Sequence, residues 1–348
     1  MVSLNASTIP VVDLRRRWEP LQAELTDAIA RVVQSGWILL GPETEAFERE
    51  FAEFCGRRHA VAVASGTEAL RLSLVALGVG AGDEVIVPAV TAVPTAAAVC
   101  AAGAVPVPAE VDPETAGIDG AAAGRAVTDR TRAVIPVHLY GRPQPLPDLG
   151  TPIVEDAAQA HGALDPSAPS ATAAYSFYPT KNLGGFGDGG AVVTDDAALA
   201  DRARLLRTHG QRAEYEHTEI AVNSRLSEFE AAALRIGLRG LAEGNARRRE
   251  IASRYRDAAP AVTWQAPHEH HVYHLCVARV ADRDAFRARM PFETGVHYPR
   301  ALTRQPAYER FGRGVYPEAE AWASECVSLP CFPEMTDDEI ETVCRALA

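Results

Sequence analysis

Short apolar runs alternate with helix-like segments through the first half of the chain. Helical periodicity fills gaps between these runs at Glu68–Leu77 and Thr95–Ala102. Alternation of strand and helix is typical of a mostly parallel sheet with helices on both faces, so the pattern predicts an α/β fold. The runs predicted as buried strands are His59–Ala64, Glu84–Val87, Val105–Val107, Ala133–Val137, Ile153–Val154, Ala173–Phe177 and Gly190–Thr194.

The pattern changes near residue 245. Amphipathic helices are predicted early in the chain, at Leu21–Ser35 and Glu43–Phe54, and a helical stretch from Leu226 to Tyr255 is interrupted at Gly237–Gly244. We therefore expect a large domain over residues 1–244 and a smaller α+β domain over residues 245–348. The elements predicted for the small domain are strands at Val272–Val280 and Glu293–His297 and helices at Arg283–Arg289, Glu318–Cys326 and Asp337–Ala346.

Composition narrows the classes of partner. The 348 residues carry a formal net charge of −12, which argues against non-specific nucleic-acid binding because that needs a basic surface. Residues 1–18 contain no apolar core of signal-peptide length, and no run approaches the roughly 20 apolar residues of a membrane span. The six cysteines are scattered and show no CxxC pairing. We therefore expect a cytoplasmic protein with reduced thiols that binds neither nucleic acid nor membrane.

One basic residue stands apart from the others. Lys181 is the only lysine among the 34 lysines and arginines of the chain. Arginine serves for ion pairs and anion binding but stays protonated, so it cannot act as an amine nucleophile. The single lysine is therefore a candidate for chemistry that needs a primary amine. The alternative is a codon bias towards arginine that left one lysine by chance.

Three segments carry candidate chemistry. In the first, Ser65-Gly66-Thr67 follows a predicted strand and opens a helix, where free amides form an anion site and glycine admits a ligand close to the backbone. An ordinary helix cap is the competing interpretation. In the second, Glu155-Asp156 ends an apolar strand, at the edge where open α/β sheets bind ligands. A buried carboxylate there needs a cationic partner such as a protonated pyridine nitrogen.

The third segment holds the lysine. Lys181 lies between a predicted strand and the glycine-rich run Gly184–Gly190. A phosphate-binding P-loop has the opposite order, with lysine after the glycines and before Ser or Thr, so that interpretation is rejected. A phosphate cradle, a carboxylate for a pyridine nitrogen and an amine for a Schiff base are together what pyridoxal 5'-phosphate (PLP) requires. The three segments therefore predict a PLP enzyme.

A resemblance to a known family makes this prediction specific. From about residue 8 to its end, the chain resembles the DegT/StrS family of PLP-dependent sugar aminotransferases. The resemblance implies a fold type I dimer, similar to aspartate aminotransferase, with shared active sites. The runs that carry it are Ser65-Gly66-Thr67, Pro136–Gly141, Glu155–Gly162, Ser176–Asn182, Gly187–Val192, Asn223–Leu226, His297-Tyr298-Pro299 and Gln305–Tyr308.

The resemblance also implies a role for each matched residue. Lys181 would hold PLP as a Schiff base, Asp156 would face the pyridine nitrogen, and Gln159 would lie against the ring near its hydroxyl. The phosphate would be held by Gly66, Thr67 and Ser176 and by Asn223 of the other subunit. The residues implied near the substrate are His161, Arg225, His297 and Tyr298. During turnover the cofactor would pass through its pyridoxamine form, with glutamate as amino donor and a keto-sugar as acceptor.

Three segments depart from the family pattern. The stretch Pro88–Pro94 lacks the aromatic residue that usually covers the cofactor ring, so we expect Ala92 or Val93 to cover it. The stretch Ala163–Ala174 is shorter than usual, and Thr303-Arg304 stands where a histidine is common before Gln305. The last two lie where substrate contacts are expected.

Four functions follow from these residues. The leading one is transfer of an amino group from glutamate to a keto-sugar, typically a nucleotide-linked deoxy-hexose of amino-sugar or antibiotic biosynthesis. A cyclitol ketone is an alternative acceptor. The other two functions are less favoured. A keto-sugar dehydratase would carry histidine in place of Lys181, and a PLP-binding regulator would carry a DNA-binding segment, for which the sequence shows no basic arm or extra domain. The histidines of His268–His274 match no standard zinc spacing, so no metal site is predicted.

Overall fold

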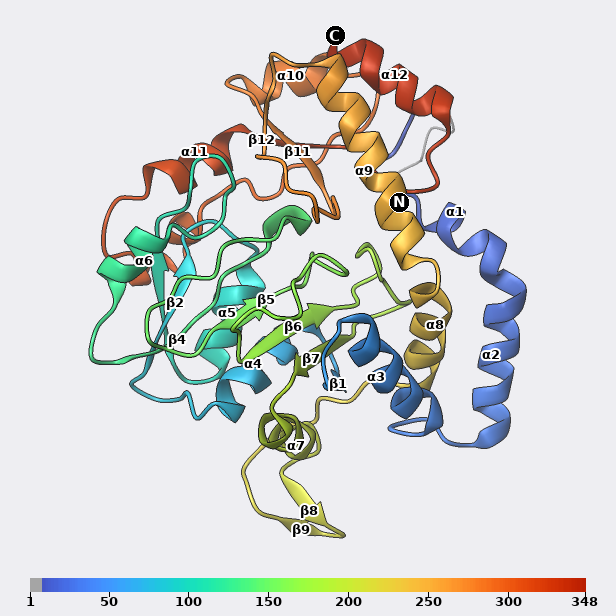
Figure 1. The fold of residues 1–348 in the computed structure, drawn as a ribbon, viewed down its shortest axis with the longest axis vertical. Coiled ribbons are helices and arrows are strands. Elements are labelled where there is room, and N and C mark those ends of the chain that lie inside the picture. Colours follow the sequence, from blue (N-terminus) through green and yellow to red (C-terminus); the bar gives the residue numbers. More distant parts are fainter. Residues whose placement is uncertain (1–7) are drawn as a thin grey trace.

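The computed structural model describes residues 8–348 and has a seven-stranded sheet at its centre, which confirms the predicted α/β fold (Figure 1). Hydrogen bonding divides the strands into a three-stranded and a four-stranded part, and parallel bridges from Val134 to Ile153 and from Val137 to Asp156 join them. The strands, in spatial order, are β3 (Val105–Ala109), β2 (Glu84–Pro88), β4 (Thr131–Val134), β5 (Val154–Asp156), β6 (Thr172–Ser176), β7 (Gly190–Thr194) and β1 (His59–Val63).

All strands of this sheet run in one direction except β7, which is antiparallel to both β6 and β1. A parallel neighbour needs a crossover connection, usually a helix, whereas an antiparallel neighbour does not. The connection from β6 to β7 covers residues 177–189 and contains Lys181 but no helix. The loop with the single lysine is therefore also the connection that reverses the chain direction.

Both faces of the sheet are buried. Along β1, Val61 and Val63 belong to the apolar cluster that includes α4 (Gly66–Ala76), α5 (Val93–Ala101) and α7 (Ala197–Leu206). Their neighbours Ala60 and Ala62 point the other way, into a cluster with α3 (Pro42–Phe54) and α8 (Glu228–Leu238). Helices on both faces explain why the strands appear as continuous apolar runs rather than as an alternating pattern.

The remaining elements surround this core. A hairpin of β8 and β9 projects from the body (Figure 1). The bounds of this hairpin and of the remaining helices are α1 (Leu14–Trp18), η1 (Glu19–Leu21), α2 (Gln22–Ser35), α6 (Gly120–Ala126), η2 (Leu139–Gly141), β8 (Gln211–Ala213), β9 (Glu216–His217), η3 (Leu302–Arg304) and η4 (Glu309–Phe311). No helix within residues 8–348 is both long and apolar enough to cross a membrane.

The C-terminal part contains a second, antiparallel sheet. Helix α9 (Leu241–Ala258) runs through residue 245 without a break, and only Arg239-Gly240 separates it from α8. The predicted strand at Glu293–His297 is wrong: Gly295 makes one isolated bridge, to Ser328. The strand lies instead at Cys326–Leu329, directly after a helix. The elements are β10 (Thr263–Trp264), β11 (Cys276–Arg279), α10 (Arg283–Arg289), α11 (Pro317–Glu325), β12 (Cys326–Leu329) and α12 (Asp337–Leu347).

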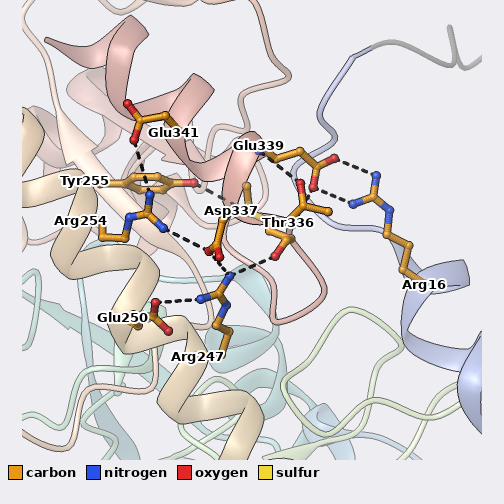
Figure 2. Close-up of polar contacts among 10 residues, drawn as sticks. Arg16, Arg247, Glu250, Arg254, Tyr255, Thr336, Asp337, Glu339 and Glu341 are labelled. Carbon is orange, nitrogen blue, oxygen red and sulfur yellow. Dashed lines mark hydrogen bonds and ion pairs between the residues drawn. The ribbon is translucent and has the colours of Figure 1, made fainter.

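A network of ion pairs holds the two ends of the chain together (Figure 2). Arg16 of α1 donates two hydrogen bonds of 2.8 Å to Glu339 of α12. On the other side of α12, Asp337 accepts from Arg247 and Arg254 of α9. The carboxylate of Glu339 also accepts from the backbone N–H of Thr336, which completes the N-terminal cap of α12. These contacts fix the N-terminal segment, whose next residue, Arg17, reaches the Lys181 loop.

Candidate active site

Three predicted site segments meet at one edge of the sheet. Asp156 ends β5, Ser176 ends β6, and Gly66 begins α4 just after β1. These strands run in the same direction, so their carboxyl ends lie at the same edge. The topology therefore brings together residues that are up to 110 positions apart in sequence, as Gly66 and Ser176 show.

Asp156 is a buried carboxylate. Its Oδ2 accepts a hydrogen bond of 2.8 Å from Thr95 Oγ1, and its Oδ1 accepts from the backbone N–H of Ala158 at 3.2 Å. Burial raises the pKa of Asp156, although these two bonds and the nearby charge of Lys181 oppose the rise. A cation bound beside this carboxylate would relieve the cost of burying its charge.

Gly66 and Ser176 touch at the start of α4. The side chain of Ser65 accepts from the N–H of Glu68 and caps this helix. The N–H groups of Gly66 and Thr67 precede the first intrahelical bond, so they are free to face a ligand. A Cβ added at Gly66 would lie 2.6 Å from the Cβ of Ser176, so the sequence needs glycine here. Backbone amides and a serine hydroxyl make a fitting phosphate cradle.

A methyl group at Gly66 should therefore disturb the cradle. We expect Gly66→Ala to weaken PLP binding by about 10-fold or more, because its Cβ pushes Ser176 or the backbone out of place. Equilibrium titration of the apo-protein with PLP measures this effect. Gly120→Ala is the control: that glycine also begins a helix, but no atom lies within 4 Å of the added Cβ. Equal affinities for the two variants would contradict a tight cradle.

The backbone of the loop around Lys181 is anchored, and the lysine itself is partly buried. Arg17 Nη1 donates to the carbonyl oxygens of Pro179 and Lys181, each at 2.9 Å, and so fixes the loop. Burial lowers the pKa of Lys181 to about 8, and the carboxylate of Asp156 offsets part of that shift. A pKa near 8 leaves part of the amine unprotonated at neutral pH, and that form is the nucleophile.

Gln159 and His161 follow Asp156 but have different surroundings. Gln159 Oε1 accepts from the backbone N–H of Tyr140 at 2.6 Å, and its Nε2 donates to the hydroxyl of Tyr298 at 3.1 Å. His161 is fully buried, and its Nε2 lies 2.9 Å from the carbonyl oxygen of Ser176. Burial and the charge of Lys181 lower the pKa of His161 to about 3, so its ring is neutral.

A cavity of about 240 Å³ opens beside Lys181. His297 and Tyr298, predicted near the substrate, line it but His161 does not, and the substrate roles of all three stay predictions. His297 Nδ1 lies 2.9 Å from the hydroxyl of Ser328, which fixes the ring at the cavity wall. The lining residues are Val11, Val12, Tyr178, Thr180, Lys181, Arg248, His274, Leu275, His297, Tyr298 and Cys331.

Of the predicted site residues, only Lys181, His297 and Tyr298 line this cavity. Asn223 is exposed, and its Oδ1 accepts a hydrogen bond of 2.8 Å from Arg225 Nε. Neither residue lines the cavity beside Lys181 of the same chain. Their roles at the cofactor phosphate and the substrate therefore stay predictions.

Three residues at the site had no place in the prediction from sequence. Thr95 binds Asp156, and His274 and Arg248 line the cavity. Thr95 had a detectable signal, because its helix follows β2 and so starts at the same sheet edge as Asp156. His274 and Arg248 come from the C-terminal part, where His274 falls in a predicted strand and Arg248 in a predicted helix, and neither pattern points to the cavity.

The residues present fit PLP. The amine, the buried carboxylate and the cradle lie at one edge of the sheet. Ala92 and Val93 lie at the start of α5, the helix that carries Thr95.

In the histidine-rich segment His268–His274, one ring already has a protein partner: His271 Nε2 lies 3.1 Å from Gln265 Oε1. Among the described residues, no group of three or more His, Cys, Asp or Glu side chains could hold a metal ion.

Comparison with known proteins gives a consistent match. The family model described as the DegT/DnrJ/EryC1/StrS aminotransferase family matches residues 20–348. A transaminase of Streptomyces venezuelae, named for dTDP-3-amino-3,4,6-trideoxy-alpha-D-glucose, is 45% identical over 94% of this chain and 92% of its own length. The "Erythromycin biosynthesis sensory transduction protein EryC1" of Saccharopolyspora erythraea is 44% identical over 97% of this chain and 98% of its own.

A solved structure agrees with these sequence matches. The crystal structure of S. venezuelae DesV in complex with a ketimine intermediate has a TM-score of 0.94 and 43% sequence identity, and the match covers 98% of each chain. A similarity of this extent covers both the sheet with Lys181 and the C-terminal part. It confirms the predicted fold type I architecture of PLP-dependent aminotransferases.

Proposed function

The chain belongs to the DegT/DnrJ/EryC1/StrS aminotransferase family and is a PLP-dependent aminotransferase, and we propose that it moves the amino group of glutamate to a keto-sugar. The reaction converts glutamate and a ketone into 2-oxoglutarate and an amino-sugar. The observation that carries the proposal is the single lysine, Lys181, within reach of the charge of Asp156 at the carboxyl edge of the sheet.

The sugar assignment has separate support. The S. venezuelae relative is named as a transaminase of a dTDP-linked trideoxy-sugar, and a further relative from Aneurinibacillus thermoaerophilus is named for a dTDP-linked dideoxy-sugar. Both match this chain over more than nine tenths of its length. We therefore propose a nucleotide-linked deoxy-hexose with a ketone as the acceptor.

Each site residue then has a defined task. Bound PLP supplies an electron sink and carries the amino group between the two substrates. Asp156 holds a proton at the ring nitrogen, because its buried carboxylate is stabilised by that positive charge. Lys181 Nζ moves the proton between the substrate carbon and the cofactor, since its lowered pKa suits an acid–base group near neutral pH. The cradle of Gly66, Thr67 and Ser176 binds the phosphate.

The donor half of the reaction tests this function without any sugar. Glutamate alone should convert the visible absorbance band of the holoenzyme into the spectrum of pyridoxamine phosphate and release stoichiometric 2-oxoglutarate. Added keto-sugar should then restore the original band. If glutamate leaves the spectrum unchanged and only an alkyl or aromatic amine alters it, the proposed donor is wrong.

We also propose that two copies of the chain form a dimer with shared active sites. Asn223 is exposed and lies outside the cavity of its own Lys181, so its amide is free to reach a phosphate held by the other subunit. Arg225, which donates to Asn223, would lie beside the same site. An isologous dimer places each such pair at the partner's cofactor.

Subunit mixing tests the shared site. Lys181→Ala removes the amine, and Asn223→Asp puts a negative charge beside the phosphate, so each variant alone should be inactive. When the two are refolded together, about half of the dimers are mixed and each mixed dimer has one intact site, so about a quarter of all sites should work. No return of activity would mean that Asn223 serves its own subunit or has no role at the phosphate.

A further inference from the structure

The cavity beside Lys181 is lined by basic side chains and by no acidic one. They are Lys181, His274, His297 and Arg248. Burial, followed by the charge of Lys181, lowers the pKa of both His274 and His297, so both rings are neutral at pH 7. Lys181 is engaged by the cofactor. Arg248 therefore supplies the permanent positive charge of this cavity wall.

Arg248 is buried without a carboxylate partner. Its Nη1 donates to the carbonyl oxygens of Cys331 and, at 3.3 Å, of Tyr273. Within residues 8–348 no acidic side chain lies within salt-bridge distance of it. The charge of Glu334 is felt at Arg248, and both residues line a neighbouring groove, but only Arg248 also lines the Lys181 cavity. A buried guanidinium that is bound only to neutral carbonyls is expected to attract an anion.

The neighbouring arginine of α9 shows the contrast. Arg247 pairs with Glu250 and with Asp337, each at 2.8 Å, on the outer side of the helix (Figure 2). The two arginines are adjacent in sequence, but one is compensated by carboxylates at the surface and the other faces the cavity without one. The unpaired charge is thus a feature of Arg248 and not of the helix.

We propose that Arg248 binds the α-carboxylate of the amino donor. The donor's amino group would take the place of Lys181 Nζ at the cofactor carbon, and the α-carboxylate is attached to the carbon that bears this amino group, so the carboxylate must lie close to Lys181. The cavity volume of about 240 Å³ has room for about eight waters at roughly 30 Å³ each, which suits a molecule of the size of an amino acid. The planar guanidinium matches a carboxylate through two parallel hydrogen bonds.

This inference rests on the proposed function. The test compares wild type with Arg248→Gln in the half-reaction with three donors. L-Glutamate carries both carboxylates, L-norvaline lacks the γ-carboxylate, and 4-aminobutyrate lacks the α-carboxylate. Arg248→Gln should lose at least about 30-fold in kcat/KM with the first two and change little with 4-aminobutyrate.

Three controls make the result interpretable. Arg247→Gln should keep wild-type rates, because it changes the same residue type one position away on the outer face. Arg248→Lys keeps the charge but loses the paired geometry, so its loss with L-glutamate should be intermediate. Retained cofactor absorbance and far-ultraviolet circular dichroism show that each variant is folded.

A readout without turnover separates this proposal from the proposed function. Glutarate, a dicarboxylate without an amine, should bind the wild-type holoenzyme in calorimetry and bind Arg248→Gln at least about 30-fold more weakly. If glutamate fails as donor but glutarate binding still depends on Arg248, the function is wrong and the anion site stands. Unchanged glutarate binding in Arg248→Gln, or an equal loss with all three donors, would overturn the role of Arg248. If Arg248→Gln does not fold, equal glutarate affinities of Arg248→Lys and wild type would overturn it.

Discussion

Replacing Lys181 by arginine should reduce turnover by a factor on the order of 10⁴ or more although the charge at this position is kept. Arginine stays protonated at any working pH, so it can neither bond to the cofactor carbonyl nor accept a proton from the substrate. The loss should appear in kcat with both substrates, because the two halves of the reaction use the same amine. Steady-state assay of amino-sugar formation measures it.

The result depends on an intact fold, which is testable separately. Lys181→Arg should still bind PLP noncovalently through the cradle of Gly66, Thr67 and Ser176, with an absorbance like that of the free aldehyde. A variant at a distant cation, Arg204→Lys, changes a surface residue paired with Asp201 at 3.0 Å and should keep wild-type turnover. Turnover of Lys181→Arg within 10-fold of wild type would contradict the assignment of the amine.

Replacing Asp156 by asparagine should lower kcat by about 10³-fold while PLP stays bound. Burial already raises the pKa of Asp156, and the opposing bonds from Thr95 and Ala158 hold its carboxylate in place. Asparagine preserves the shape but cannot stabilise a positive ring nitrogen, so the electron sink is weakened. Single-turnover measurement with glutamate isolates this step from product release.

The neighbouring carboxylate provides a matched control. Glu155 is equally buried, but its Oε2 lies 2.8 Å from His138 Nε2. Burial alone would raise the pKa of Glu155; the hydrogen bond and charge of His138 outweigh this and lower it. Glu155→Gln should therefore reduce the free energy of unfolding by about 1–3 kcal/mol and leave the donor half-reaction within a few-fold. If Asp156→Asn reacts as fast as Glu155→Gln, the carboxylate of Asp156 has another role.

The sheet and the catalytic motif could be predicted from the sequence, and the reason is physical. Strands buried on both faces are continuous apolar runs, and β7 was predicted with its exact bounds, Gly190–Thr194. The motif around Lys181 is local, so its residues could be recognised without strand order. The segments of Asp156 and Gly66 could be placed at strand ends, where ligands bind.

The missed features depend on long-range packing. The strand at Cys326–Leu329 pairs with β11, whereas the sequence predicted a helix that ended at Cys326 and no strand after it. Arg248 falls within the predicted helical stretch Leu226–Tyr255, and only the fold places it at the cavity wall. His161 was expected near the substrate, but the fold turns its ring to the backbone of Ser176, and its role there stays a prediction.

Reduction with borohydride identifies the residue that holds the cofactor, because it fixes the cofactor to whichever amine carries it. Lys181 is the only lysine, so the α-amino group is the sole other primary amine of the chain. Peptide mapping of the reduced holoenzyme should find the cofactor on the peptide with Lys181, and Lys181→Arg should acquire none. Cofactor found on the N-terminal peptide, or no covalent cofactor in the wild-type protein, would contradict the role of Lys181.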